Sequence, residues 1–340
     1  MPEGRVQDRP PSMADVAALA GVSHQTVSRV LNDASLVKPE TRERVLEAIR
    51  QLGYRRNSAA RSLATRRSGR IGMVSAHLSL HGPTMISAAV HGAANRLGYD
   101  VSMSALDEIS PESLQQAVDR LLDQSVEALV VAVANRAALA TTRALHLPIP
   151  VVIAQGVERG EPLAAGVDQE HGAVIAVRHL LDLGHTSVAH VTGPLEWVEG
   201  GERRAGWQAA HLERGLVPGP AEVGDWTAES GYRAGLALAE NPAVTAVFAA
   251  NDAMALGVLR ALHERGRDVP GEISVVGFDD VPEAAYFWPA LTTVNQAFSV
   301  LGTRALELAV RAIEGEEAPT ADLVEPTLVV RRSTGRPRQV

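Results

Sequence analysis

Strand-like and helix-like stretches alternate from residue 70 to near the end of this 340-residue chain. Amphipathic stretches such as 111–124, 171–183 and 252–265 are expected as helices. The apolar, β-branched runs expected as strands are 71–76, 101–106, 128–133, 151–155, 187–192, 246–250 and 274–277. Continuous apolar strands that alternate with helices are typical of parallel sheets covered on both faces. Because one such sheet rarely takes this many residues, the sequence predicts an α/β body of two lobes.

The first 53 residues have a different pattern, that of three short helices. Ser12 and Asp15 have the spacing of a capping box, and Gly21 separates this first helix from a second one over 23–31. Pro39 suits the first turn of a third helix. The residues expected to form a small shared core are Val16, Leu19, Ala20, Val27, Val30, Leu31, Val45, Leu46, Ile49 and Leu52. Two short helices joined by a glycine-containing turn indicate a helix-turn-helix, an all-α unit whose second helix enters the major groove of DNA.

Charge is divided unevenly along the chain. Residues 1–70 hold 13 Arg and Lys against 7 Asp and Glu, a net charge of +6, whereas the rest nets −14. A basic segment attached to an acidic body indicates a polyanionic partner for that segment. A solvated, arginine-rich helical surface is the alternative that charge alone leaves open.

Side chains of the second predicted helix suit the recognition of double-stranded DNA. Gln25 can pair with adenine and Arg29 with guanine, and His24 lies beside them at the start of the helix. Short donors suited to phosphate oxygens are Ser23, Thr26, Ser28, Asn32 and Thr41. In the alternative interpretation, Ser23 only caps the helix and Arg29 is only a solvated charge.

Residues 13–32, MADVAALAGVSHQTVSRVLN, resemble the DNA-binding signature of the lactose/galactose repressor family, and residues 54–64, YRRNSAARSLA, resemble its hinge helix. The similarity continues to about residue 332. It implies a helix-turn-helix domain over 1–53, a hinge helix or linker over 54–69, and a body over 70–340 that binds an effector and dimerises. Within the body it implies two lobes that resemble periplasmic sugar-binding proteins, an N-lobe of about 70–167 and 296–326 and a C-lobe of about 168–295 and 327–337.

The resemblance also gives a role to residues 57–65, which are too few for a helix that is stable alone in water. It implies that they fold on DNA against a second copy of the chain, that Asn57 and Leu63 contact the DNA, and that Leu63 inserts into the minor groove. Without the resemblance, Leu63 is simply the linker's one anchoring hydrophobe. No leucine heptads resembling the family's tetramerising helix follow the last predicted strand, so we expect a homodimer.

Polar residues lie where several predicted strands of the body end. Asn251 and Asp279 each follow a strand, and Arg203 lies on the helix after another. Ligands bind at the carboxyl ends of parallel strands, and these groups, with an aromatic face from Trp226 or Phe298, suit a sugar. Taken singly, Trp226 is as well explained as an aromatic that packs the lobes, and Arg203 as a surface charge.

The family resemblance implies that three of these residues hydrogen-bond a small sugar effector and that others line its pocket. The hydrogen-bonding residues are Arg203, Asn251 and Asp279, and the lining residues are Trp226, Gln296 and Phe298. Ala76, Ala132 and Gln155 stand at pocket positions where the family has a serine, an asparagine and an aspartate. The N-lobe side of the pocket is therefore altered, which leaves the identity of the sugar open, a galactoside included.

Several classes of protein fit the sequence poorly. The chain has no cysteine and no apolar run of the roughly 18 residues that span a bilayer, and nothing at its start resembles a secretion signal, so we expect a cytoplasmic protein without membrane contact. Its histidines lack metal-ligand spacing, and we expect neither metal nor cofactor. A sugar-processing hydrolase would have to use Asp279 and Asp280, but adjacent carboxylates seldom face each other across the ~5–9 Å that glycoside hydrolysis needs. The sequence thus favours a sugar-responsive transcriptional regulator, most simply a repressor and not an enzyme, over a transport-type sugar-binding protein.

Overall fold

The computed structural model describes residues 11–32, 37–54, 67–107, 110–157, 160–317 and 323–338. The chain divides into two compact units, Met1–Ser68 and Gly69–Val340. The first unit contains helices, and the second combines helices with parallel sheets. Each unit is described by itself below.

The first unit packs helices α1 (Met13–Ala20), α2 (His24–Asn32) and α3 (Pro39–Leu52) around a small core. Ser12 and Asp15 form the expected capping box before α1, and α1 and α3 both end at a glycine with left-handed backbone. The buried core consists of Val16, Ala17, Ala20, Val27, Val30, Val45, Ala48 and Tyr54. The expectation that Leu19 faces this core is wrong, because its side chain is 50% exposed and Ala17 is buried instead.

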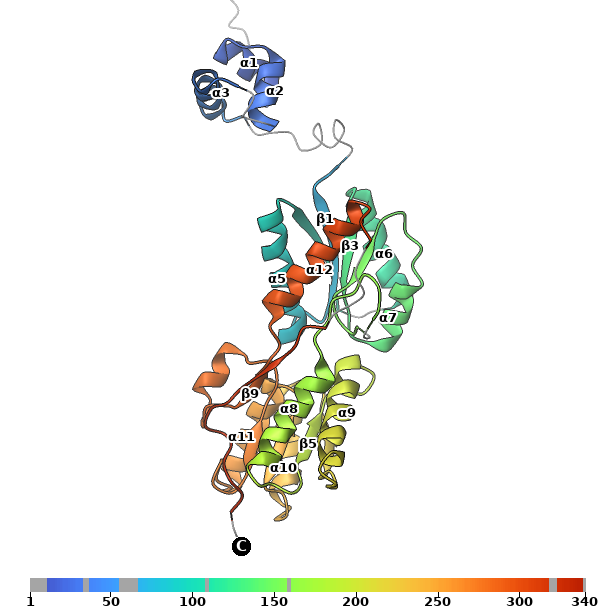
Figure 1. Ribbon diagram of the computed structural model, residues 1–340, viewed down its shortest axis with the longest axis vertical. Helices are drawn as coiled ribbons and strands as arrows, with labels where there is room; N and C mark the ends of the chain where they lie inside the picture. The colour runs from blue at the N-terminus through green and yellow to red at the C-terminus, as the bar shows by residue number, and fades with distance from the viewer. Residues whose placement is uncertain are drawn as a thin grey trace, which may run out of the picture. The chain divides into compact units, whose positions relative to one another are not determined.

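The N-lobe of the second unit is a four-stranded parallel sheet in the order β2-β1-β3-β4, with two helices on each face (Figure 1). Its strands are β1 (Arg70–Ala76), β2 (Asp100–Leu106), β3 (Ala128–Ala132) and β4 (Val151–Ile153). Helices α5 (His81–Leu97) and α12 (Phe298–Ile313) cover one face, and α6 (Pro111–Asp123) and α7 (Arg136–Arg143) cover the other.

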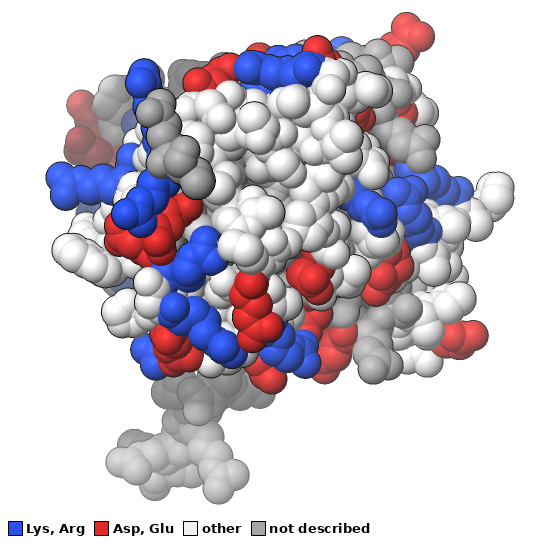
Figure 2. Space-filling model, turned by 90° about the horizontal axis from the view of Figure 1, so that it is seen from below, with Lys and Arg blue, Asp and Glu red and all other residues white. Residues whose placement is uncertain are grey.

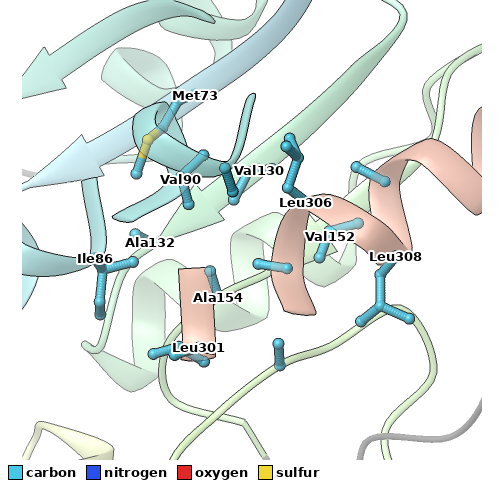
Figure 3. Packing of buried hydrophobic residues seen from close by; sticks show 14 of the residues in the cluster. Met73, Ile86, Val90, Val130, Ala132, Val152, Ala154, Leu301, Leu306 and Leu308 are labelled. Atoms are coloured by element: carbon cyan, nitrogen blue, oxygen red, sulfur yellow. The ribbon is translucent and has the colours of Figure 1, made fainter. Parts of the chain in front are cut away.

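Burial of aliphatic side chains joins α5 and α12 to the sheet. Figure 3 shows Met73, Val130 and Val152 of the strands facing side chains of these two helices. The helices approach closely because α12 carries Gly302, where a Cβ atom would lie 2.4 Å from the Cβ atom of Ala89. This core therefore depends on a helix that follows residues 168–295, most of the C-lobe, along the chain.

The C-lobe repeats the same plan, with a parallel sheet in the order β6-β5-β7-β8. Its strands are β5 (Ala189–Thr192), β6 (Ala221–Val223), β7 (Ala246–Ala249) and β8 (Ser274–Val276). Helices α8 (Gln169–Asp182) and α9 (Val198–Leu212) cover one face, and α10 (Ala228–Ala239) and α11 (Asp252–Glu264) cover the other (Figure 1). Helices α10 and α11 cross at two glycines, since a Cβ atom on Gly231 or Gly257 would lie about 2 Å from a carbonyl oxygen of the other helix.

Three stretches of chain connect the lobes. Val167, Phe298 and Val324 belong to the N-lobe core. The chain enters the C-lobe at Gln169, leaves it after Val294, and returns to it at Leu328. Two of the three stretches pair as an antiparallel ribbon of β9 (Thr293–Asn295) and β10 (Thr327–Val329), and a 3-10 helix, η2 (Pro282–Tyr286), precedes β9.

The seven strands expected from the sequence are present: β1 and β2 begin one residue earlier than expected, and the other five are shortened at one end by one or two residues. The sequence did not predict β6, β9 or β10, each only three residues long. β4 and β8 are equally short, but β6 and β10 are partly exposed, and β9 and β10 pair with each other across a long stretch of chain.

Charges of both signs are interspersed on the surface of the protein. On the face seen in Figure 2, basic and acidic side chains alternate around a largely uncharged area. Ion pairs between exposed side chains include Arg178–Glu213 at 2.7 Å and Arg265–Glu240 at 3.3 Å. No helix in the described part of the chain has the length and apolar character needed to cross a membrane.

Candidate functional site

Helix α2 presents a polar face to solvent and an apolar face to the small core. Its residues His24, Gln25 and Arg29 are exposed, whereas Val27 and Val30 are buried. The side chains predicted to contact base edges are therefore free of the core. This arrangement suits a helix that enters the major groove.

The predicted phosphate-contacting residues have different surroundings. The hydroxyl of Ser23 accepts a hydrogen bond from the backbone N–H of Thr26 at 3.2 Å and lies 2.9 Å from the Thr26 hydroxyl. Ser23 thus caps α2, as its alternative interpretation held. Thr26, Ser28 and Thr41 are half-buried, and the Asn32 side chain, Asn57 and Leu63 lie outside the described residues.

A cavity lies between the two lobes of the second unit, with an empty volume of about 630 Å³ that includes space open to solvent. Seven of the eight residues predicted to bind an effector line it: Gln155, Arg203, Trp226, Asn251, Asp279, Gln296 and Phe298. Ala76 is not among the described lining residues, because it packs in the core between β1 and α6. Among the residues described, no group of three or more His, Asp or Glu side chains is placed to hold a metal ion.

A closed set of polar contacts forms one side of this cavity. The Arg203 Nε donates to the Gln169 Oε1 at 2.9 Å, and the Gln169 Nε2 donates to the Gln296 Oε1 at 2.8 Å. The Gln296 Nε2 in turn donates to the Asp279 Oδ1 at 2.6 Å, and the Asp279 Oδ1 lies 3.8 Å from the Arg203 Nη1. Residues that are far apart in the sequence thus hold one another in fixed orientations.

Burial controls the ionisation of this set. Burial lowers the pKa of the Arg203 guanidinium, and nearby Asp279 opposes that change. Burial likewise raises the pKa of the Asp279 carboxyl, against the effects of Arg203, His81 and the hydrogen bond from Gln296. The guanidinium also lies over the Phe278 ring, 3.8 Å from its centroid. Arg203 and Asp279 therefore compensate each other's charge at the edge of the cavity.

The Trp226 ring is held in a cramped position on the cavity wall. Its backbone is left-handed, with φ of 72°, and the ring contacts Gly193 so closely that a Cβ atom there would lie 2.1 Å away. The Asn251 Nδ2 donates to the Trp226 carbonyl at 3.0 Å, and its Oδ1 caps α11 by accepting from the Met254 N–H at 2.8 Å. Asn251 thus supports Trp226 as well as lining the cavity, a role that the sequence did not suggest.

Sequence reasoning missed four polar or aromatic lining residues, Gln169, Trp197, Glu199 and Glu202. Burial raises the pKa of Glu199, and burial together with Glu199 and the acids of α8 raises the pKa of Glu202 to about 8. Helical spacing could have found Glu199, which lies four residues before Arg203 on the same face of the helix, and then Glu202, three residues after Glu199.

The start of α9 joins the cavity wall to the N-lobe. The Val198 N–H donates to the Ala134 carbonyl at 3.0 Å, and the Arg136 N–H donates to the Glu196 carbonyl at 3.1 Å. The Trp197 ring contacts the His77 ring with centroids 5.1 Å apart. Residues that line the cavity therefore contact both lobes.

Two parallel-sheet lobes around a polar cavity, in one chain with a helix-turn-helix, define a class: DNA-binding regulators with a periplasmic-binding-protein-like body. Residues 177–334 match the periplasmic binding protein-like domain, and residues 12–57 match the bacterial regulatory proteins of the lacI family. This chain belongs to the LacI family of bacterial regulatory proteins.

Relatives match over nearly their whole lengths. The lactose operon repressor of Escherichia coli (strain K12) is 36% identical over 97% of this chain and 92% of its own. The transcriptional regulator CelR of Thermobifida fusca is 34% identical over 96% of this chain and 99% of its own. A crystal structure of the lac repressor dimer bound to operator and the anti-inducer ONPF, 35% identical, has a TM-score of 0.85 over 96% of this chain and 100% of that one. These relatives are transcriptional regulators.

Proposed function

We propose that this protein is a transcriptional repressor that binds a pseudo-palindromic operator as a homodimer and releases it when a small sugar enters the cavity. Residues 1–53 read the DNA, 54–69 form the hinge, and 70–340 bind the sugar and dimerise. The observation that carries the proposal is the cavity of about 630 Å³, with an ordered polar edge and aromatic walls, in a chain that also presents an exposed reading helix.

The cavity offers what a sugar needs. Asp279 and Gln296 supply oxygens that accept from hydroxyl groups, and the Arg203 guanidinium holds Gln169 and Asp279 in place. The rings of Trp226 and Phe298 offer apolar faces to the C–H side of a pyranose. Because contacts among the protein's own residues hold these groups, the sugar meets a site that is largely formed in advance.

Coupling between sugar and DNA follows from the position of the cavity between the lobes. A sugar that contacts both lobes favours one arrangement of the lobes over another, and the two hinges of a dimer sense that arrangement. The two reading helices must lie one helical turn apart, about 34–36 Å, to engage both half-sites. By linkage, operator DNA must weaken sugar binding by the factor with which the sugar weakens operator binding.

The test is a fluorescence-anisotropy titration of an operator selected from random duplexes, with and without lactose, galactose or cellobiose. We expect one of these sugars to raise the operator Kd at least tenfold, and the operator to raise that sugar's Kd by the same factor. Arg203→Ala should bind operator normally and fail to respond to the sugar. A sugar that tightens operator binding, or no response to any sugar tested, would overturn the proposal.

Other readings of the sequence fit the comparisons less well. A transport-type sugar-binding protein has no use for residues 12–57, which match the DNA-binding family model. The relatives that match over nearly their whole lengths carry names of repressors and regulators rather than of transporters or hydrolases.

A further inference from the structure

Two carboxylates on the first turns of α9, Glu199 and Glu202, face the cavity beside Arg203. The Glu199 side chain is 95% buried, since only 5% of the residue is exposed. Its carboxylate interacts with the Gln155 side chain and the Gly156 backbone of the N-lobe, and its Oε2 has no hydrogen-bond partner among the described residues. The Glu199 Oε2 is thus an unpaired hydrogen-bond acceptor at the wall of the cavity.

Two further polar atoms of the wall are buried without a hydrogen-bond partner. The Gln155 Oε1 and the Trp226 Nε1 also lack a hydrogen-bond partner within the described part of the chain. Of these three atoms, two accept and one donates. Because an unsatisfied buried polar group destabilises the protein, a ligand that donates to Glu199 and Gln155 removes that unfavourable contribution when it binds.

Carboxyl groups outnumber cationic groups in the wall of the cavity. Glu199, Glu202 and Asp279 all line it, and Arg203 is the one Lys or Arg among its described lining residues. The guanidinium of Arg203 is already engaged by Gln169, the Ala250 carbonyl and the Asp279 carboxylate. A phosphate or carboxylate on a ligand would therefore be buried without a free cation to balance its charge, and its oxygens carry no hydrogen to donate to the unpaired acceptors of the wall.

We propose that the cavity selects an uncharged saccharide whose hydroxyl groups donate to Glu199 and Glu202, and that it rejects the phosphorylated or carboxylated forms of the same sugar. The inference rests on the proposed function, because it names the chemical class of the effector to which the proposed repressor responds. The two glutamates act as specificity-determining residues: they accept hydrogen bonds from hydroxyl groups and offer an anion no compensating positive charge.

The test compares matched pairs of probes by isothermal titration calorimetry on the full chain. The neutral members are glucose, galactose, lactose and cellobiose, and the anionic members are glucose 6-phosphate, galactose 6-phosphate, lactobionate and cellobionate. We expect at least one neutral sugar to bind, and its anionic counterpart to bind at least 100-fold more weakly.

Glu199→Gln and Glu202→Gln test the role of the two glutamates. Each replaces an oxygen with an amide of the same shape, and the double variant should weaken binding of the neutral sugar about 10- to 100-fold and narrow its preference over the anionic form. Glu196→Gln is the matched control, because Glu196 lies just before α9, is exposed and does not line the cavity. Thermal unfolding without sugar and operator affinity check that each variant is folded.

The outcomes separate the inference from the proposed function. An anionic probe that binds as tightly as its neutral partner and releases the operator would overturn the inference and leave the repressor function standing. A folded double variant with the affinity and preference of the unmodified chain would also overturn it. Failure of every probe to bind or to affect operator affinity would overturn the sugar response itself, and the inference with it.

Discussion

Replacement of Gly193 by alanine should displace the Trp226 ring without replacing any residue that lines the cavity. Gly193 follows β5, and an added Cβ atom would lie 2.1, 2.3 and 2.6 Å from three atoms of that ring. The ring has little room to move, because it is buried and packs edge-on against Trp197. The Trp226 carbonyl also accepts a hydrogen bond from Asn251, which restricts the backbone.

The size of the effect follows from these distances. Ordinary contact begins at 3.4 Å, so the ring must move by about 1.3 Å away from Gly193. Displacement of a positioned group by about 1 Å can lower its effect by about 100-fold. We expect the sugar Kd to rise about 10- to 100-fold, which corresponds to about 1.4–2.8 kcal/mol of binding free energy.

Isothermal titration calorimetry with a neutral sugar measures the loss, and operator titration by anisotropy should give an unchanged Kd in the absence of sugar. Gly82→Ala is the matched control, because Gly82 also lines the cavity but its added Cβ atom would meet only Phe298, at 3.9 Å. Unchanged sugar affinity in Gly193→Ala, or an equal loss in Gly82→Ala, would refute the reasoning.

Three other predictions concern the reading helix, the helix packing and a titrating group. Arg29→Ala should cost about 1–3 kcal/mol of preference for operator over random duplex in anisotropy titrations, with sugar binding unchanged; equal loss of both would contradict it. Gly231→Ala should lower the free energy of unfolding in urea by about 1–3 kcal/mol, since its Cβ atom would lie 2.1 Å from the Met254 carbonyl oxygen. Gly92→Ala, whose added atom has no neighbour closer than 3.6 Å, should not, and equal stabilities would count against the argument. Burial and neighbouring acids raise the pKa of Glu202 from 4.5 to about 8, so the unfolded chain releases this proton first and the folded state loses stability as pH rises from 4.5 to 8. Glu202→Gln lacks that loss, and its Tm relative to the unmodified chain should increase between pH 5 and pH 8; a constant difference would contradict the assignment.

Much of the fold was predictable because short stretches of sequence carry the signals of its strands and helices. The strands β1, β3 and β7 are runs of buried apolar residues, and the capping box at Ser12 fixes where α1 begins. The residues Arg203 and Asp279 were found because the carboxyl ends of parallel strands meet at one edge. In each case the relevant physics acts within a few residues or follows from topology.

The rest depended on contacts between distant parts of the chain. Leu19 has the spacing of a core residue, yet its side chain is half exposed and Ala17 is buried in the core instead. The sequence marks Asn251 as a polar residue at a strand end but does not reveal that it holds the Trp226 carbonyl. Glu199 looks like a surface acid on a helix until Gln155 and Gly156 of the N-lobe cover it.

The placement of α12 has a consequence for how the protein is made. The N-lobe sheet is complete once β4 has been synthesised, but the helix that covers one of its faces, with Leu301 and Leu306, follows all four strands of the C-lobe sheet. During synthesis on the ribosome, one apolar face of the N-lobe therefore stays without this helix while most of the C-lobe is made. Slow or arrested translation between these two segments would lengthen the time in which the nascent chain can aggregate.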